Sequence, residues 1–126
     1  MINNPMKTPW RLTLALLLAA GCQMSGAESQ PETIKGYVLD SACAFTKNLK
    51  KPISAECAVA CAKAGSPLVI LTDNGTIYWP ISDAMPAQGQ NSRLLEFAGK
   101  KVSVKGKVYQ RGGSRAVVIA SIEAER

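Results

Sequence analysis

The 126-residue sequence contains no histidine, and aromatic residues make up only 6% of it. Without histidine, the chain lacks the side chain that most often acts as a general base or completes a catalytic triad. The sequence also contains no serine elbow and no glycine-rich phosphate loop. These absences argue against a conventional hydrolase. We therefore expect a protein that is not an enzyme, unless its thiols carry redox chemistry.

Long apolar runs are also scarce, and the one that exists stands near the start. Lys7 and Arg11 precede the run at residues 12–20, which ends in small residues. A basic segment followed by a short apolar stretch and a small-residue site is the pattern of an export signal, and the run is too short to span a bilayer stably. We therefore predict a signal peptide over residues 1–21.

The end of this run carries a more specific pattern, Leu18-Ala-Ala-Gly-Cys22. It resembles the lipobox of bacterial lipoproteins, in which the cysteine is lipidated and becomes the first mature residue. The resemblance implies a palmitate-type acyl anchor at Cys22. Because Gln23 rather than aspartate follows, it also implies the outer membrane, facing the periplasm. Ala19 stands where the family prefers leucine, so ordinary secretory cleavage is the alternative.

The segment after Cys22 is polar and aperiodic, and we interpret residues 22–32 as a flexible tether. Without the leader, 13 basic residues stand against 9 acidic ones, a net charge of +4. This mild excess of basic residues is scattered along the chain and indicates a solvated basic surface. The functional alternative is that the basic residues attract the protein to anionic lipid headgroups. For an exported protein we expect no nucleic-acid partner.

Residues 33–126 are enough for one small domain. Asn74-Gly75 separates two β-rich runs, which is typical of a hairpin. Gly106 interrupts an alternating strand, as a barrel corner would. The residue pattern predicts a short helix over residues 91–99 and five strands over residues 33–40, 67–73, 76–81, 101–109 and 115–122.

This order of elements resembles the OB-fold, and three stretches look like small secreted bacterial OB-fold proteins: Gly36-Tyr-Val-Leu-Asp40, Asp73-Asn-Gly-Thr-Ile-Tyr78 and residues 98–108. The resemblance implies a mainly β, five-stranded Greek-key barrel. It places a short helix between strands 3 and 4 and a helical cysteine insertion between strands 1 and 2. An open α+β sheet is the alternative. The fold does not imply a function.

Three of the four cysteines lie in the insertion, at positions 43, 57 and 61. Ser54 and Gly65 bound an alanine-rich stretch that predicts a helix, so Cys57 and Cys61 fall on one face at i and i+4. Their Cβ atoms would then lie about 5–6 Å apart, whereas a disulfide needs about 3.8 Å. Cys43 follows the first strand in a predicted loop and can meet either. If one disulfide forms, we expect Cys43–Cys61.

Three functions compete for these thiols. In the first, the Cys43–Cys61 disulfide stabilises the domain by about 3 kcal/mol. The protein is then a lipid-anchored cell-envelope module that binds a protein, an envelope component or a ligand on its barrel face, where Tyr78 and Trp79 either pack or form a stacking platform. In the second, Cys43, Cys57 and Cys61 bind Cu(I) or Zn(II) in the periplasm, with Asp40 as a further candidate ligand. In the third, Cys57 near a helix N-terminus is a redox thiol.

The anchor can be tested by the Cys22→Ala substitution. We expect the variant to be unlipidated and to lose membrane attachment, because cleavage of the leader leaves no other apolar segment to hold the protein. Detergent partitioning and mass spectrometry of the mature N-terminus measure both effects. A wild-type protein that starts after Ala27 without acyl chains would contradict the lipoprotein assignment.

Overall fold

The computed structural model describes residues 30–47 and 54–126. The predicted signal peptide, Cys22 and the predicted tether up to residue 29 lie outside the described residues. Within the described ranges, no helix combines the length and the apolar character that crossing a bilayer would require.

Five strands form a closed barrel in the order β1-β2-β3-β5-β4. β1 pairs antiparallel with both β2 and β4, and β3 pairs parallel with β5. The elements in chain order are β1 (Glu32–Asp40), α1 (Ser41–Thr46), α2 (Ala55–Lys63), β2 (Leu68–Thr72), β3 (Ile77–Pro80), α3 (Asn91–Leu94), the 3₁₀-helix η1 (Leu95–Phe97), β4 (Lys101–Arg111) and β5 (Ser114–Ala124).

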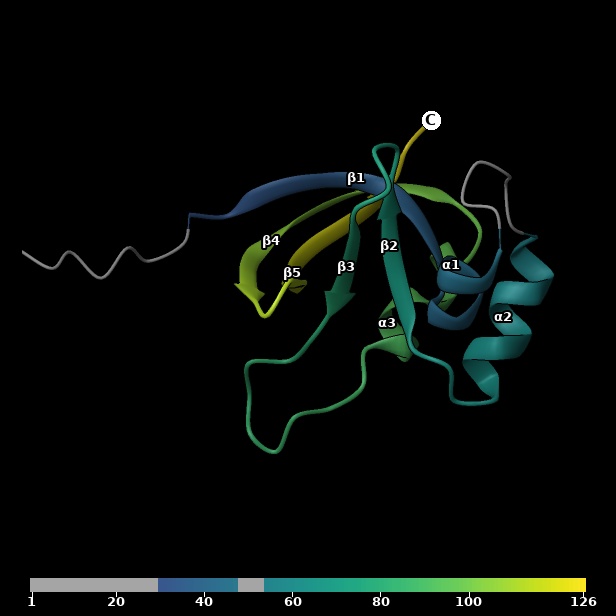
Figure 1. The fold of residues 1–126 in the computed structure, drawn as a ribbon, viewed down its shortest axis with the longest axis horizontal. Coiled ribbons are helices and arrows are strands. Elements are labelled where there is room, and N and C mark those ends of the chain that lie inside the picture. Colours follow the sequence, from purple (N-terminus) through teal and green to yellow (C-terminus); the bar gives the residue numbers. More distant parts are fainter. Residues whose placement is uncertain (1–29, 48–53) are drawn as a thin grey trace, which may run out of the picture.

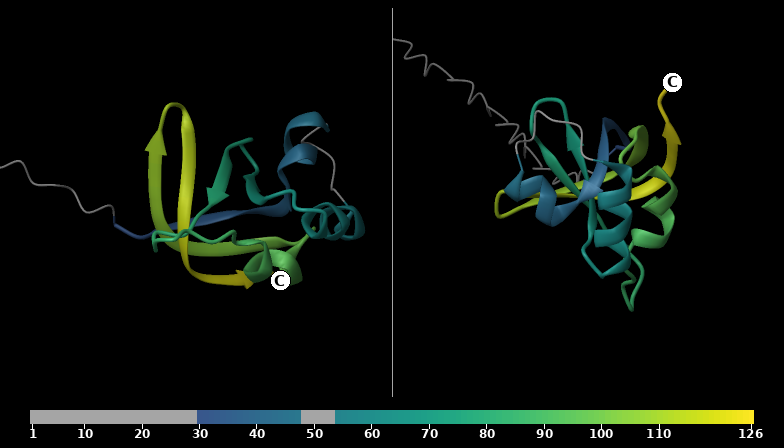
Figure 2. Two further views of the ribbon diagram at one scale, coloured as in Figure 1. Left: turned by 90° about the horizontal axis from the view of Figure 1, so that it is seen from below. Right: turned by 90° about the vertical axis from the view of Figure 1, so that its right-hand side faces the viewer.

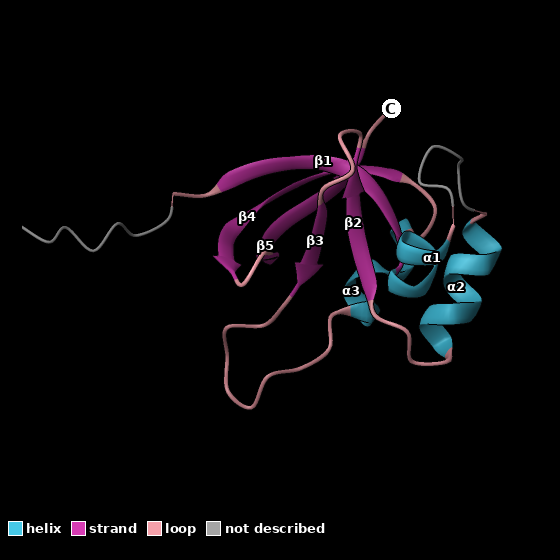
Figure 3. Cartoon of the chain, in the orientation of Figure 1, coloured by secondary structure: helices cyan, strands magenta, loops and turns pink. Residues whose placement is uncertain are grey.

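The expected OB-fold-like barrel is therefore confirmed, and the alternative of an open α+β sheet is wrong. A short helical segment, α3 with η1, connects β3 to β4, and the cysteine insertion connects β1 to β2 (Figure 3). The insertion differs from expectation in one respect. Cys43 does not lie in a loop but in a second short helix, α1, which begins directly after β1.

The inside of the barrel is filled by one apolar cluster. Val102 and Val104 of β4 point inward, as the alternating sequence predicted. Gly106 continues this buried row, and the register between β4 and β5 shifts at this point. A Cβ atom at Gly106 would collide with the carbonyl oxygen of Val118, so only glycine lets β5 approach here. The other buried members of the cluster are Ile34, Val38, Ala62, Leu68, Ile70, Tyr78, Leu94, Val117 and Ile119.

A second apolar cluster lies between the barrel wall and α1. It consists of Leu39, Ala44, Val69 and Leu71, with Ile77 and Trp79 packed against it. Residues 68–71 of β2 are consequently buried on both faces of the strand, which explains their unbroken apolar run. α1 and α2 lie at the side of the barrel away from the β4–β5 turn (Figure 2). The insertion is thus packed onto the barrel and held in a defined position.

Asn91 fastens the end of α2 to the barrel. Its side-chain amide donates to the carbonyl oxygens of Ala62 (3.2 Å) and Ser66 (2.8 Å), and its Oδ1 accepts from the backbone N–H of Leu68 (2.8 Å). Asn91 is also the first residue of α3. The N-cap of α3 is Gln90, which makes no side-chain capping bond.

The close approach at Gly106 can be tested by Gly106→Ala, with Gly89→Ala as the control, because a Cβ atom at Gly89 meets no atom within 4 Å. We expect Gly106→Ala to lower the free energy of unfolding by about 1–3 kcal/mol, as overpacking does. The control should change it by less than about 0.5 kcal/mol. Urea unfolding midpoints at unchanged m-value measure both. Equal midpoints for the two variants would show that β5 can move away at no cost.

Candidate metal centre

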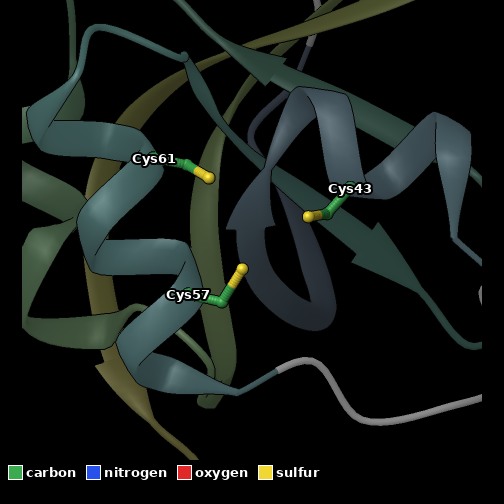
Figure 4. Close-up of side chains that lie close together, drawn as sticks. All are labelled: Cys43, Cys57 and Cys61. Atoms are coloured by element: carbon green, nitrogen blue, oxygen red, sulfur yellow. The ribbon is translucent and has the colours of Figure 1, made fainter.

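The two helices of the insertion bring three cysteines together. Cys43 comes from α1, and Cys57 and Cys61 come from α2. Their three Sγ atoms all lie within 4.8 Å of one another. Figure 4 shows the side chains pointing toward a common point between the helices.

Each helix begins with a capping side chain three residues before a cysteine. Asp40 Oδ2 accepts the backbone N–H of Cys43 at 3.1 Å, and Ser54 Oγ accepts the backbone N–H of Cys57 at 3.1 Å. These bonds satisfy backbone donors that the first helical turn leaves free. They also fix the backbone from which both thiols project.

The face of α2 matches the sequence prediction. Cys57 and Cys61 are one turn apart on the side that faces α1, and small buried residues, Ala58 and Ala62, let the helix sit close to the barrel. Close packing continues at Gly99, where an added Cβ atom would come within 2.6 Å of the Ala55 Cα atom. The start of α2 therefore packs closely against the turn at Gly99.

Cys43, Cys57 and Cys61 are free thiols in this structure. The expected Cys43–Cys61 disulfide is thus not formed here, and it stays a prediction for the oxidised protein. The third thiol, Cys57, is not distant from this pair. Its Sγ atom lies within 4.8 Å of the Sγ atoms of both Cys43 and Cys61.

The three thiols differ in their access to solvent. Cys43 is buried, Cys61 is half-buried and Cys57 is exposed. The cluster is thus closed on the barrel side and open at Cys57. An ion or a reagent would reach it from that side.

A buried carboxylate borders the cluster. Asp40, at the end of β1, is 0% exposed. Its Oδ2 accepts from the Cys43 N–H and, at 3.4 Å, from the Ser66 hydroxyl. No donor stands in hydrogen-bonding geometry to Oδ1, which makes it the one orphaned buried side-chain oxygen or nitrogen among the described residues.

Asp40 and burial both favour the protonated thiols. The pKa of Cys43 is raised to about 12, first by hydrogen bonding of the protonated thiol with the Asp40 carboxylate, then by burial and by the negative charge of Asp40. The pKa of Cys61 is also raised, first by burial and then by the charge of Asp40. At neutral pH these two sulfurs keep their protons unless a cation takes the place of those protons.

The predicted stacking platform is only partly present. Tyr78 is buried in the barrel core and is not available for stacking. Trp79 lies on the outer face, where its ring centroid is 6.3 Å from that of the exposed Phe45 on α1. Trp79 and Ile81 also line a pocket of about 700 Å³ beside the segment of residues 87–92.

Two parts of the site were not foreseen in detail: the helix α1 and the capping role of Asp40. The sequence carries a cue for both, because Asp40-Ser-Ala-Cys43 has the same spacing as Ser54-Ala-Glu-Cys57. Aspartate is as good an N-cap as serine. Reading the two segments side by side would have predicted two capped helices, each with a cysteine in its first turn.

No protein-family model matches this chain, and neither the curated proteins nor the solved structures provided a match. The case for function therefore depends on the site itself.

The electrostatics of the site predict an order of thiol reactivity in the reduced, metal-free protein. Cys57 should be alkylated first, and Cys43 should resist alkylation until the pH approaches its pKa of about 12. Asp40→Asn removes the charge that favours the protonated thiol, so alkylation of Cys43 should begin at lower pH. Peptide mass spectrometry after timed alkylation at several pH values measures this. An unchanged pH profile for Cys43 in Asp40→Asn would contradict the role assigned to Asp40.

Proposed function

We propose that this protein is a lipid-anchored protein of the cell envelope that binds one soft metal ion, Cu(I) or Zn(II), through Cys43, Cys57 and Cys61. The observation that carries the proposal is the convergence of three sulfur atoms within 4.8 Å. A disulfide uses two cysteines and does not account for the position of the third, whereas a metal ion can use all three.

The spacing of the sulfur atoms suits a metal. A Zn–S bond is about 2.3 Å long, so two thiolates on a tetrahedral ion stand about 3.8 Å apart. The sulfurs of this cluster need to close by about 1 Å at most from their 4.8 Å limit. Side-chain rotation can supply such a movement while both helices stay in place.

The donor set selects the class of ion. Thiolates are soft ligands that favour Cu(I) and Zn(II), and hard ions such as Mg²⁺ and Ca²⁺ prefer oxygen. Binding would displace up to three thiol protons, which pass to solvent.

A bound ion would also stabilise a small domain. Structural zinc sites contribute roughly 10–16 kcal/mol of apparent binding free energy in small peptides, compared with about 3 kcal/mol for a disulfide that closes a loop of this size. Bound metal would further keep all three thiols from oxidation in the periplasm, where free thiols tend to form disulfides.

The location in the envelope is supported by the sequence alone. The basic residues Lys7 and Arg11, the apolar run and the lipobox-like stretch ending at Cys22 together suggest export and acylation. We place the protein on the outer membrane, facing the periplasm. An oxidising compartment is also where protection of thiols by a metal would matter most.

Separate observations support the other two hypotheses, which are ligand binding on the barrel face and thiol redox chemistry. The pocket beside Trp79 is the feature that favours binding of a protein, an envelope component or a ligand on the barrel face. This function is compatible with a metal centre at the insertion. A redox function would use the exposed Cys57 and a neighbouring thiol, and it predicts a disulfide that forms and breaks during turnover.

The proposal is tested with reduced protein prepared without affinity-column metals and loaded with Cu(I) or Zn(II). We expect one ion per chain, protection of all three thiols, and stabilisation of about 2.7 kcal/mol when free metal exceeds Kd a hundredfold. Cys57→Ser should abolish or strongly weaken binding, because it removes one of three ligands. Elemental analysis, thiol titration and unfolding curves measure these effects.

The control is Ala60→Ser, which places a serine on the exposed side of the same helix. It should bind metal as the wild type does. Absence of bound metal, together with a Cys43–Cys61 peptide after digestion of the native protein, would overturn the proposal in favour of the disulfide.

A further inference from the structure

A metal site made only of Cys43, Cys57 and Cys61, called the trithiolate site below, does not explain why Asp40 is buried beside it. Asp40 is a fully buried acidic residue with one oxygen engaged and the other left without a donor. A buried charged group with one oxygen left without a donor costs more free energy than a neutral group in the same position. Buried charges in proteins are accordingly paired or coordinate metals. A cation bound to Oδ1 would supply the partner that this oxygen lacks.

We propose that Asp40 Oδ1 is the fourth ligand of the site, and that the resident ion is four-coordinate Zn(II) bound by three sulfurs and one oxygen. This inference rests on the proposed metal-binding function and adds the coordination number and the identity of the ion. Zn(II) takes carboxylate oxygen at about 2.0–2.2 Å alongside thiolate sulfur, and structural zinc sites are almost always tetrahedral.

The backbone around Asp40 supports this role. Asp40 ends β1 and pairs with Leu68 of β2, while Cys43 stands three residues further in the first turn of α1. The bonds from the Cys43 N–H and the Ser66 hydroxyl hold Oδ2 and thereby orient the carboxylate. Such outer bonds typically fix the orientation of a ligating group. Oδ1 is the oxygen that remains for a ligand.

The carboxylate also lies beside the cluster. Its Oδ2 accepts the backbone N–H of Cys43 at 3.1 Å, so the carboxylate is adjacent to the first of the three ligands. Asp40 is not among the residues whose ligand atoms all lie within 4.8 Å of one another, so Oδ1 has to move toward the sulfurs when an ion binds. Cys57, on the exposed side, completes the set from the opposite helix. An ion held by the three sulfurs would thus have its fourth position on the buried side, toward Asp40.

Charge favours a divalent ion over a monovalent one. Three thiolates and the carboxylate carry four negative charges when all are ionised. Zn(II) would leave a net charge of −2 at the site and Cu(I) a net charge of −3. Because uncompensated charge is costly at a half-buried site, the extra carboxylate disfavours Cu(I) unless it contributes a bond.

This difference gives a test in which only the affinity for Zn(II) is expected to fall. Asp40→Asn keeps an equally good N-cap for α1 but removes the charge and the second carboxylate oxygen. If Asp40 is a ligand, Zn(II) affinity should fall by more than about 100-fold, beyond the 10–100-fold typical of an outer partner. Cu(I) affinity should stay the same or rise, since a neighbouring negative charge is gone. Competition with chromophoric chelators measures both affinities in the full mature chain.

Two further proteins keep the test independent of folding defects. Asp40→Ser retains a capping oxygen and has no second one, so it should lose Zn(II) in the same way. Asp73→Asn is the matched control, because this exposed aspartate at the β2–β3 hairpin pairs with Lys101 at 3.0 Å. It should bind both ions as the wild type does. Circular dichroism and urea unfolding verify that all variants fold.

A spectroscopic measurement on the wild type needs no variant. Co(II) in place of Zn(II) should give the intense ligand-field bands of a tetrahedral site together with sulfur-to-metal charge transfer, and Asp40→Asn should weaken or shift the ligand-field bands. Unchanged bands, or Zn(II) affinity that is retained or raised in Asp40→Asn, would overturn the inference while leaving the trithiolate site intact. Failure of the wild type to bind either ion would instead overturn the proposed function itself.

Discussion

The structure depends on the double pairing of β1. This strand is hydrogen-bonded to β2 along its second half and to β4 along its first, and it thereby closes the barrel. Gly36 belongs to both pairings, and a Cβ atom there would come within 2.5 Å of the Leu71 carbonyl oxygen. The strand can turn from one partner to the other only because this residue has no side chain.

The same pairing brings the two ends of the cysteine insertion together. Asp40 stands opposite Leu68 in the register, and the Ser41 N–H donates to the Pro67 carbonyl oxygen at 2.8 Å. The segment between β1 and β2 must therefore begin and end at neighbouring positions. Two short helices lie in this segment, and the cysteines that they carry come within 4.8 Å of one another at their sulfur atoms. The convergence of the thiols follows from closure of the barrel rather than from attraction between the thiols.

Several elements could be recognised from residue patterns because their causes are local. The Asn74-Gly75 turn requires a positive φ, which Gly75 adopts at 85°. Ser54 caps α2 as expected, and Gly65 follows the helix with a φ of 103°. α1 was missed because it has only six residues and one buried flank, which is too short for a periodic pattern. Its stability comes from the Asp40 cap and from Ala44, which is buried against β2. Both depend on how the insertion packs on the barrel.

The sequence by itself determined the order of strands, the helical spacing of Cys57 and Cys61, and the absence of histidine as a ligand. These properties follow from neighbours within a few residues or from composition alone. Only the tertiary structure decided that Cys43 joins the other two thiols and that Asp40 is buried beside them with one oxygen free. That information lies in the register of β1 against β2 and in the packing of α1 on the barrel, contacts between residues about 25 positions apart. No local pattern encodes the distance between such residues, because closure of the barrel sets it.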